Sequence, residues 1–245
     1  MVRLPEQKAV MNSMGFPGQG LEPAIKRLKK SQKYKSRVLV SIAGTIEDEI
    51  FECLRRTQSL VSGIELNISS PNTAGLKIFH EPARLRSLIE GLVSEKQVPL
   101  FVKLPPWPRD DENRREILKL AATAVDAGVD GLVVANTHPI ESSRLQVGRG
   151  GLSGAPLFEH TELMIADIQA QVQGQAAIIA CGGVSTAEQV WKLLATGASA
   201  VQLYTSFIYE GPGLPARINK RLAKLMTAAG ITNVSEISGA PPEIK

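Results

Sequence analysis

The segments DAGVDGLVVANT (126–137) and ATGASAVQLYTS (195–206) decide the fold. Each starts at the end of a helical stretch, turns at a glycine (Gly128 or Gly197) and enters a short apolar run that ends in polar residues. A glycine in this place is typical of a helix that stops in the left-handed conformation just before a strand. The weak repeat indicates successive helix–strand units of one sheet.

The same alternation extends over most of the chain. Continuous apolar runs, which indicate strands buried on both faces, predict strands at 38–43, 63–68, 99–104, 131–135, 176–181 and 200–204. Helical patterns predict helices near 20–33, 45–57, 82–95, 111–127, 157–172, 186–195 and 214–229. Thr45 and Thr186 each precede acidic residues, so both are predicted to be N-caps.

Polar clusters follow nearly every predicted strand, which favours a barrel over an open sheet, where the site gathers at one switch point. We therefore expect an α/β fold of the TIM-type β/α barrel. The chain supplies about six of the eight strands that such a barrel needs. We expect one domain over residues 1–245 that lacks the first two strand units, with Met1 at a truncation.

Composition excludes several classes of protein. The 245 residues are 43% hydrophobic and 4% aromatic, with no apolar run long enough to span a membrane and only two cysteines, so a reducing cytoplasm is expected. The net charge of +4 owes much to one basic run, Lys26 to Arg37. It suits a solvated helix end, or alternatively an anionic surface; no aromatic platform accompanies it, so no nucleic-acid partner is expected.

The segment CGGVST (181–186) predicts a phosphate site. Gly182 and Gly183 lie between a strand and the capped start of a helix, where backbone N–H groups and the helix dipole favour an anion. Tyr204 and Thr205, after the next strand, would add hydroxyl and amide donors, because the loops after the last two strands of a β/α barrel commonly hold phosphate. The alternative is that these glycines only serve packing.

The segment NISSPNTAGLK (67–77) is rich in groups that could bind and react. Asn67 and Asn72 offer the donors and acceptors that a cyclic imide or ureide needs, and Ser69 or Ser70 could act at a reacting carbon. A local turn, in which these side chains satisfy nearby backbone, explains the pattern equally well.

Further candidates lie at other strand ends. Asn136 and Thr137 are followed by a long loop that ends in GRGGLSG (148–154), and loops of this length are usually functional. Asn12 is another candidate amide. Lys103 lies inside an apolar strand, so we expect it to pair with an anion or a cofactor. The three histidines lack metal-ligand spacing, so no metal is expected, and Cys181 suits a buried thiol better than a nucleophile.

Taken together, these motifs resemble the dihydroorotate dehydrogenase family. The resemblance rests on NISSPNTAGLK, VKLPP (102–106), VVANT (133–137), GGLSG (150–154), IIACGGVST (178–186) and AVQLYTS (200–206), and on the opening RLPEQKAVMNSMGFPGQG (3–20). It covers nearly the whole chain, from about Arg3 to Gly239.

The resemblance implies oxidation of dihydroorotate to orotate in pyrimidine (UMP) biosynthesis, with FMN as cofactor. It places Ser70 as the base that takes the C5 proton while the C6 hydride passes to the flavin. By the same resemblance, the substrate is bound by Asn12, Asn67, Asn72, Asn136 and Thr137. Lys103 would lie beside the flavin ring, and the phosphate and ribityl end would be held by Ser153, Gly154, Gly182, Gly183, Tyr204 and Thr205.

Serine at the base position resembles the quinone-reducing branch, which implies a quinone acceptor. Such an enzyme would be cytoplasmic, with peripheral attachment to the inner face of the membrane through an absent N-terminal segment. The segment SIAGT (41–45) and Lys77 depart from that branch, and the former is closer to the soluble one. The alternatives are a related flavin barrel that uses fumarate or a dihydropyrimidine, and a non-catalytic remnant.

Overall fold

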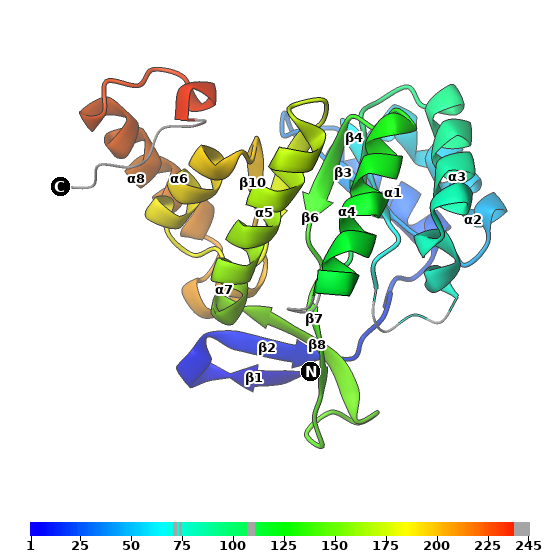
Figure 1. The fold of residues 1–245 in the computed structure, drawn as a ribbon, viewed down its shortest axis with the longest axis horizontal. Helices are drawn as coiled ribbons and strands as arrows, with labels where there is room; N and C mark the ends of the chain where they lie inside the picture. Colours follow the sequence, from blue (N-terminus) through cyan, green and yellow to red (C-terminus); the bar gives the residue numbers. More distant parts are fainter. Residues whose placement is uncertain (71–72, 74, 107–110, 238–245) are drawn as a thin grey trace. The chain divides into compact units, whose positions relative to one another are not determined.

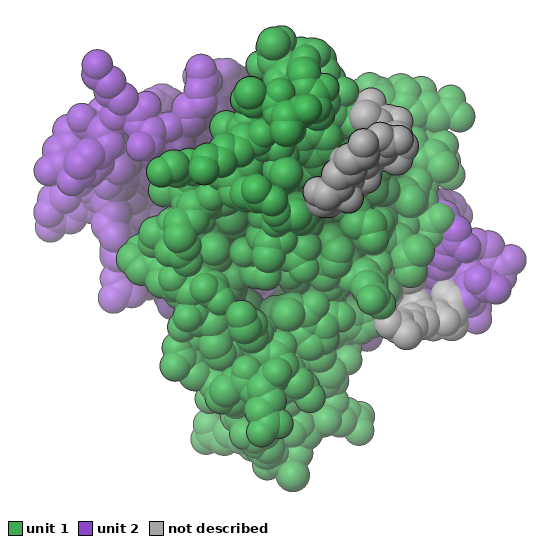
Figure 2. Space-filling view, turned by 90° about the vertical axis from the view of Figure 1, so that its left-hand side faces the viewer, with its two compact units in different colours: residues 1–13, 134–245 green, residues 14–133 purple. Residues whose placement is uncertain are grey.

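The computed structural model describes residues 1–70, 73, 75–106 and 111–237. The chain divides into two compact units, one of residues 1–13 and 134–245 and the other of residues 14–133 (Figure 2). Each unit has its own secondary structure and is described separately.

The unit of residues 14–133 is built from βα repeats. Its strands, β3 (Leu39–Ile42), β4 (Gly63–Asn67), β5 (Leu100–Lys103) and β6 (Gly131–Val134), pair in parallel in this order. Its helices are α1 (Leu21–Ser31), α2 (Glu47–Thr57), α3 (Pro82–Glu95) and α4 (Asp111–Asp126), with short 3-10 helices at Gln58–Leu60 and Leu76–His80. All are labelled in Figure 1 except the 3-10 helices and β5.

The two faces of this sheet differ in polarity. Side chains alternate along a strand, so Ile64, Leu66 and Val102 lie on one face, where all three are buried. The opposite face carries Glu65 on β4 and Lys103 on β5. This alternation places polar groups within an otherwise apolar sheet.

The unit of residues 1–13 and 134–245 contains two kinds of sheet. Strands β9 (Ala177–Cys181) and β10 (Ala200–Gln202) pair in parallel, and the helices are α5 (Phe158–Val172), α6 (Ala187–Thr196), α7 (Thr205–Glu210) and α8 (Leu214–Ala228). An antiparallel sheet has the order β1-β2-β8-β7, formed by β1 (Val2–Leu4), β2 (Ala9–Asn12), β7 (His138–Glu141) and β8 (Arg149–Gly154) (Figure 1). Short 3-10 helices lie at Pro5–Gln7, Ala155–Leu157 and Val234–Ile237.

The six predicted strands are confirmed. The parallel sheet has the order β10-β9-β6-β5-β4-β3, and the seven predicted helices are present with ends that differ by a few residues. The sequential order of strands, each followed by a helix, is that of an incomplete β/α barrel, as the sequence predicts.

Two expectations about local structure were wrong. Residues 138–154, expected to form a long loop, contain β7 and β8, which pair with each other, and β8 also pairs with β2. A Cβ at Gly150 would collide with the Asn12 carbonyl oxygen of β2. Glycine is therefore required there by close strand pairing, although it weakens the sequence signal for a strand. Thr186 is the N-cap of α6, as predicted. Thr45 is not the N-cap of α2: Ile46 occupies that position, and the Thr45 N–H donates to the Glu49 carboxylate.

Candidate functional site

The candidate residues fall into two groups, one in each unit. Asn67, Ser70 and Lys103 belong to residues 14–133; the other unit contains Asn12, Asn136, Thr137, Ser153, Gly154, Gly182, Gly183, Tyr204 and Thr205. Asn72 lies outside the described residues.

Three of the predicted phosphate-site residues meet at the end of β8. The Thr205 hydroxyl donates to the Ser153 hydroxyl over 2.9 Å, and Ser153 in turn donates to the Val10 carbonyl over 3.1 Å. Gly154 has a φ of +105°, and a Cβ there would lie 2.7 Å from Ala9 Cα and 3.0 Å from Thr205 Cγ2. The Gly154 backbone thus packs directly against the start of β2, with the Ser153 and Thr205 hydroxyl groups beside it. Hydroxyl groups of this kind suit an anionic group better than an apolar one.

The Gly182-Gly183 turn forms a second close approach of backbone. Gly183 has a φ of +74°, and a Cβ there would collide with the backbone of Phe158 at the start of α5; a Cβ at Gly182 would collide with the Thr161 hydroxyl. Both glycines are therefore fixed by packing, which was the alternative interpretation of this motif.

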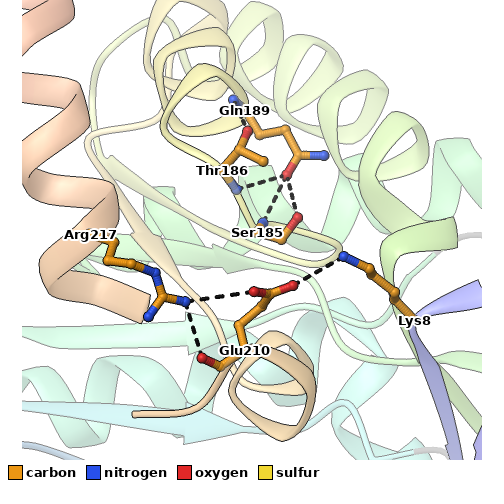
Figure 3. A network of polar contacts seen from close by, with 6 residues as sticks. All are labelled: Lys8, Ser185, Thr186, Gln189, Glu210 and Arg217. Atoms are coloured by element: carbon orange, nitrogen blue, oxygen red, sulfur yellow. Dashed lines mark hydrogen bonds and ion pairs between the residues drawn. The ribbon is translucent and has the colours of Figure 1, made fainter. Parts of the chain in front are cut away.

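The N-terminus of α6 supplies fewer donors than the sequence suggested. A capping box occupies it: the Thr186 hydroxyl accepts from the Gln189 N–H, and Gln189 Oε1 accepts from the N–H groups of Ser185 and Thr186 (Figure 3). These three N–H groups already have partners within the chain. An anion near this turn would rely on the glycine backbone before the cap.

Tyr204 contributes differently from the expectation. Its side chain is 77% exposed, and the residue is the N-cap of α7. Any contribution of Tyr204 to binding beside Ser153 and Gly154 would therefore come from its backbone. Thr205, by contrast, is buried.

Contacts that the sequence did not predict fix α7 against the β1–β2 hairpin. The Tyr209 hydroxyl donates to the Ala9 carbonyl over 2.6 Å. Glu210 forms ion pairs with Lys8 at 3.0 Å and with Arg217 of α8 at 3.6 Å (Figure 3). Because Thr205 begins α7, these contacts hold its hydroxyl beside Ser153.

Asn12, Asn136 and Thr137 also come together in this unit. Asn12 pairs with Gly151 across β2 and β8, and the Thr137 side chain occupies the space where a Gly151 Cβ would be. The Asn136 Oδ1 atom accepts from the Thr137 N–H over 2.7 Å. The Thr137 side chain therefore lies against Gly151 of β8, in register with Asn12, and Asn136 is held beside Thr137.

The other unit holds the candidate base. The hydroxyl groups of Ser70 and Thr73 are 3.0 Å apart, and either can donate to the other. Asn67 Oδ1 accepts from both the N–H and the hydroxyl of Ser69, which is the local turn that the sequence left open. That turn fixes the orientation of the Asn67 amide. His80 Nε2 lies 2.9 Å from the Ile68 carbonyl oxygen and so ties the segment after β4 to the 3-10 helix of Leu76–His80.

Lys103 has an acidic neighbour, as expected for a lysine inside an apolar strand. Its ammonium lies 3.8 Å from the Glu65 carboxylate, and the Ser41 hydroxyl donates to the same Glu65 oxygen over 2.8 Å. The sequence analysis did not single out Glu65 or Thr73. An acidic residue inside the apolar run GIELN was the available signal for Glu65.

The repeated βα units and the paired hydroxyl groups at the ends of their strands are those of an enzyme of the β/α-barrel class. The family model for dihydroorotate dehydrogenase matches residues 1–226. The chain belongs to the dihydroorotate dehydrogenase family.

Relatives named for this activity cover nearly the whole chain. A dihydroorotate dehydrogenase (quinone) of Sphingopyxis alaskensis is 34% identical over 254 residues, which cover 98% of this chain and 70% of that protein. The protein of the same name from Parvibaculum lavamentivorans is 34% identical over 97% of this chain and 70% of its own length.

Solved structures with a similar fold belong to the same family. The crystal structure of DHODH from Eimeria tenella in complex with ferulenol has a TM-score of 0.83 and 32% identity, and the match covers 96% of this chain and 72% of that one. The ligand-free structure of the same enzyme also has a TM-score of 0.83. Among the described residues, no helix is long and apolar enough to cross a membrane.

Proposed function

We propose that this chain oxidises dihydroorotate to orotate in pyrimidine biosynthesis, with FMN as the hydride acceptor and a quinone as the final electron acceptor. Its membership of a family whose similar members are named dihydroorotate dehydrogenase (quinone) carries the proposal. The paired hydroxyl groups of Ser70 and Thr73 support it, because the reaction needs a group that removes a proton.

Ser70 is proposed as the base. A serine hydroxyl is a weak base unless its own proton can leave, and the Thr73 hydroxyl, 3.0 Å away, is placed to receive it. The substrate proton would pass to Ser70 Oγ as the Ser70 proton passes to Thr73 Oγ1, and the Thr73 hydroxyl proton would pass on to solvent. Asn67, Asn72, Asn12, Asn136 and Thr137 are proposed to bind the pyrimidine ring and its carboxylate through amide and hydroxyl groups.

The residues present fit FMN. The hydroxyl groups of Ser153 and Thr205 and the backbone of Gly154 would hold the phosphate and ribityl end, together with the Gly182-Gly183 turn and the backbone of Tyr204. Lys103 would lie beside the ring and favour the negative charge of its reduced form. When bound, FMN supplies the two-electron acceptor that no amino-acid side chain provides.

We also propose that the protein works in the cytoplasm at the inner face of the membrane, where a quinone dissolved in the bilayer is accessible. Separation of the source cells into membrane and soluble fractions, with the native protein detected by an antibody, tests this location. Native protein found only in the soluble fraction contradicts it.

The choice of electron acceptor is tested by steady-state oxidation of dihydroorotate with a short-chain ubiquinone or with fumarate. We expect turnover with the quinone and little with fumarate. Faster turnover with fumarate would favour the soluble branch, to which SIAGT (41–45) is closer. Dihydrouracil in place of dihydroorotate tests the substrate in the same assay.

A further inference from the structure

Glu65 is an acidic residue in the middle of β4. Its neighbours Ile64 and Leu66 are fully buried, and its own side chain is only 8% exposed. A carboxylate in such a place loses most of its hydration, so it is retained only with partners that compensate for the loss. Nothing in the proposed chemistry so far uses this group.

The strand register explains which partners it has. Ser41 of β3 lies directly opposite Glu65, and Lys103 of β5 lies opposite Asn67, two residues further along the same face of β4. Their side chains therefore point to one face and meet there: Glu65 Oε1 accepts from the Ser41 hydroxyl over 2.8 Å and lies 3.8 Å from Lys103 Nζ. Three adjacent strands thus contribute to one polar cluster, in which Glu65 and Lys103 are largely buried and Ser41, on the outer strand β3, is exposed.

The position of the Lys103 ammonium depends on the groups around it, because its own side chain is flexible. A lysine side chain has four rotatable bonds. Glu65 is less free, because the short Ser41 side chain on the neighbouring strand β3 holds its carboxylate by a hydrogen bond. The Lys103 side chain is only 15% exposed, so its ammonium depends on protein partners rather than on water. Glu65 is therefore the group that can hold the ammonium in place.

We propose that Glu65 is a positioning residue: with Ser41 it fixes the place of the Lys103 ammonium and offsets part of its charge. This role rests on the proposed function, in which Lys103 lies beside the flavin ring. Because Glu65 offsets part of the Lys103 charge, it limits how strongly the site favours the negatively charged, reduced flavin. The oxidised cofactor is then not bound beside an uncompensated positive charge.

The pairing is tested first without flavin, by urea unfolding of the full chain and a double-mutant cycle. Lys103→Met leaves the Glu65 carboxylate buried without its cation, so the unfolding midpoint should fall clearly. Adding Glu65→Gln should recover most of that loss. If Lys103→Met does not fold, a double variant that folds again equally shows that Glu65→Gln offsets the loss of Lys103. Losses that simply add, or a double variant that stays unfolded, overturn the pairing.

The second test measures the midpoint potential of bound flavin. Glu65→Gln keeps an oxygen that accepts from Ser41 but removes the negative charge, so the potential should rise relative to the native protein. Glu95→Gln is the matched control, because it removes the same charge from the same unit at an exposed ion pair with Arg55, and it should leave the potential unchanged. An unchanged or lower potential in Glu65→Gln overturns the proposed role.

The two tests separate the failures. If the protein binds no FMN, the proposed function is wrong, and the unfolding cycle still decides whether Glu65 and Lys103 form a coupled pair. If flavin binds and dihydroorotate reduces it, but Glu65→Gln behaves like Glu95→Gln, the proposed function stands and the role of Glu65 is wrong.

Discussion

Ser70 and Thr73 illustrate how far single residues could be interpreted from the sequence. The sequence identified Ser70 as a candidate and showed that a serine base needs a partner, but several nearby hydroxyl groups could have served. The backbone after β4 brings Thr73 Oγ1 to 3.0 Å from Ser70 Oγ. Such a contact depends on loop conformation, which residue types alone do not specify.

Ser70→Ala should slow flavin reduction by dihydroorotate by roughly 100-fold or more, because it removes the proposed general base. Orotate affinity should hardly change. Thr73→Val should slow reduction by about 10-fold, since Ser70 keeps its hydroxyl but loses its proton acceptor. Rapid-mixing measurement of flavin absorbance checks both, with the exposed helical residue Ser94 changed to alanine as the control. A near-native rate in Ser70→Ala contradicts the assignment.

Thr205→Val should weaken FMN binding about five- to tenfold, because one hydroxyl hydrogen bond contributes roughly 1 kcal/mol. The change keeps the shape of the side chain beside Gly154 while removing the donor to Ser153. Titration of the apoprotein with FMN measures the effect. Thr227→Val, at an exposed helical site of the same unit, should bind FMN as the native protein does. Equal affinity of the two variants would place the phosphate elsewhere. Gly183→Asp would test the phosphate site less cleanly than Thr205→Val, because any Cβ at Gly183 would collide with the Phe158 backbone.

At the scale of elements, the apolar parallel strands were predictable and the antiparallel ones were not. Strands buried on both faces, such as β9, are continuous apolar runs. By contrast, β8 has the sequence RGGLSG. Its glycines Gly150 and Gly154 are there because the hairpin that contains β2 passes too close for a side chain, and Gly151 because the Thr137 side chain fills the space. The reason for Gly150 and Gly154 is a tertiary contact about 140 residues away in the chain, which local patterns do not contain.

Thr186→Ala should lower the free energy of unfolding by about 1 kcal/mol, the usual cost of losing an N-cap side chain. The capping box also holds Ser185 through Gln189, so the loop before α6 should loosen. Urea unfolding measures the loss. Thr196→Ala, at the other end of α6, removes a hydroxyl that bonds only to the helix backbone and should cost less. Equal losses would show that the cap contributes nothing particular.

The ion pair between α6 and α8 should make stability depend on acid pH. The Arg221 guanidinium, hydrogen-bonded to Glu188, holds the pKa of that carboxyl below its usual value. A lowered pKa in the folded state stabilises the fold above the pKa of the unfolded chain, and this stabilisation is lost as pH falls through the folded value.

Arg221→Gln should therefore reduce stability by about 0.5 kcal/mol near pH 7, a small effect because both side chains are partly exposed. The difference from the native protein should shrink as the pH falls below the ordinary pKa range of a glutamate, and it should vanish below the lowered pKa of Glu188. Urea unfolding at a series of pH values measures it, with Lys224→Gln on the same helix as the control. A difference that grows on acidification has the opposite sign and contradicts the assignment.

For the whole molecule, the order of units and the family could be predicted because many short motifs occur in one order along the chain. The match to the family model and the TM-score of 0.83 to the Eimeria tenella enzyme confirm that prediction. The chain spans about 70% of the length of the relatives that it matches. The geometry within each group of site residues was not predictable, because it depends on side-chain contacts such as that of Thr205 with Ser153.

The central claim, that this chain is a flavin-dependent dihydroorotate dehydrogenase, is tested most directly by loading the purified protein with FMN and adding dihydroorotate without oxygen. The account predicts that the yellow flavin absorbance is lost, that orotate appears in an amount equal to the flavin reduced, and that a quinone restores the colour. Protein that binds FMN but keeps its absorbance with dihydroorotate, while dihydrouracil bleaches it, would contradict the account.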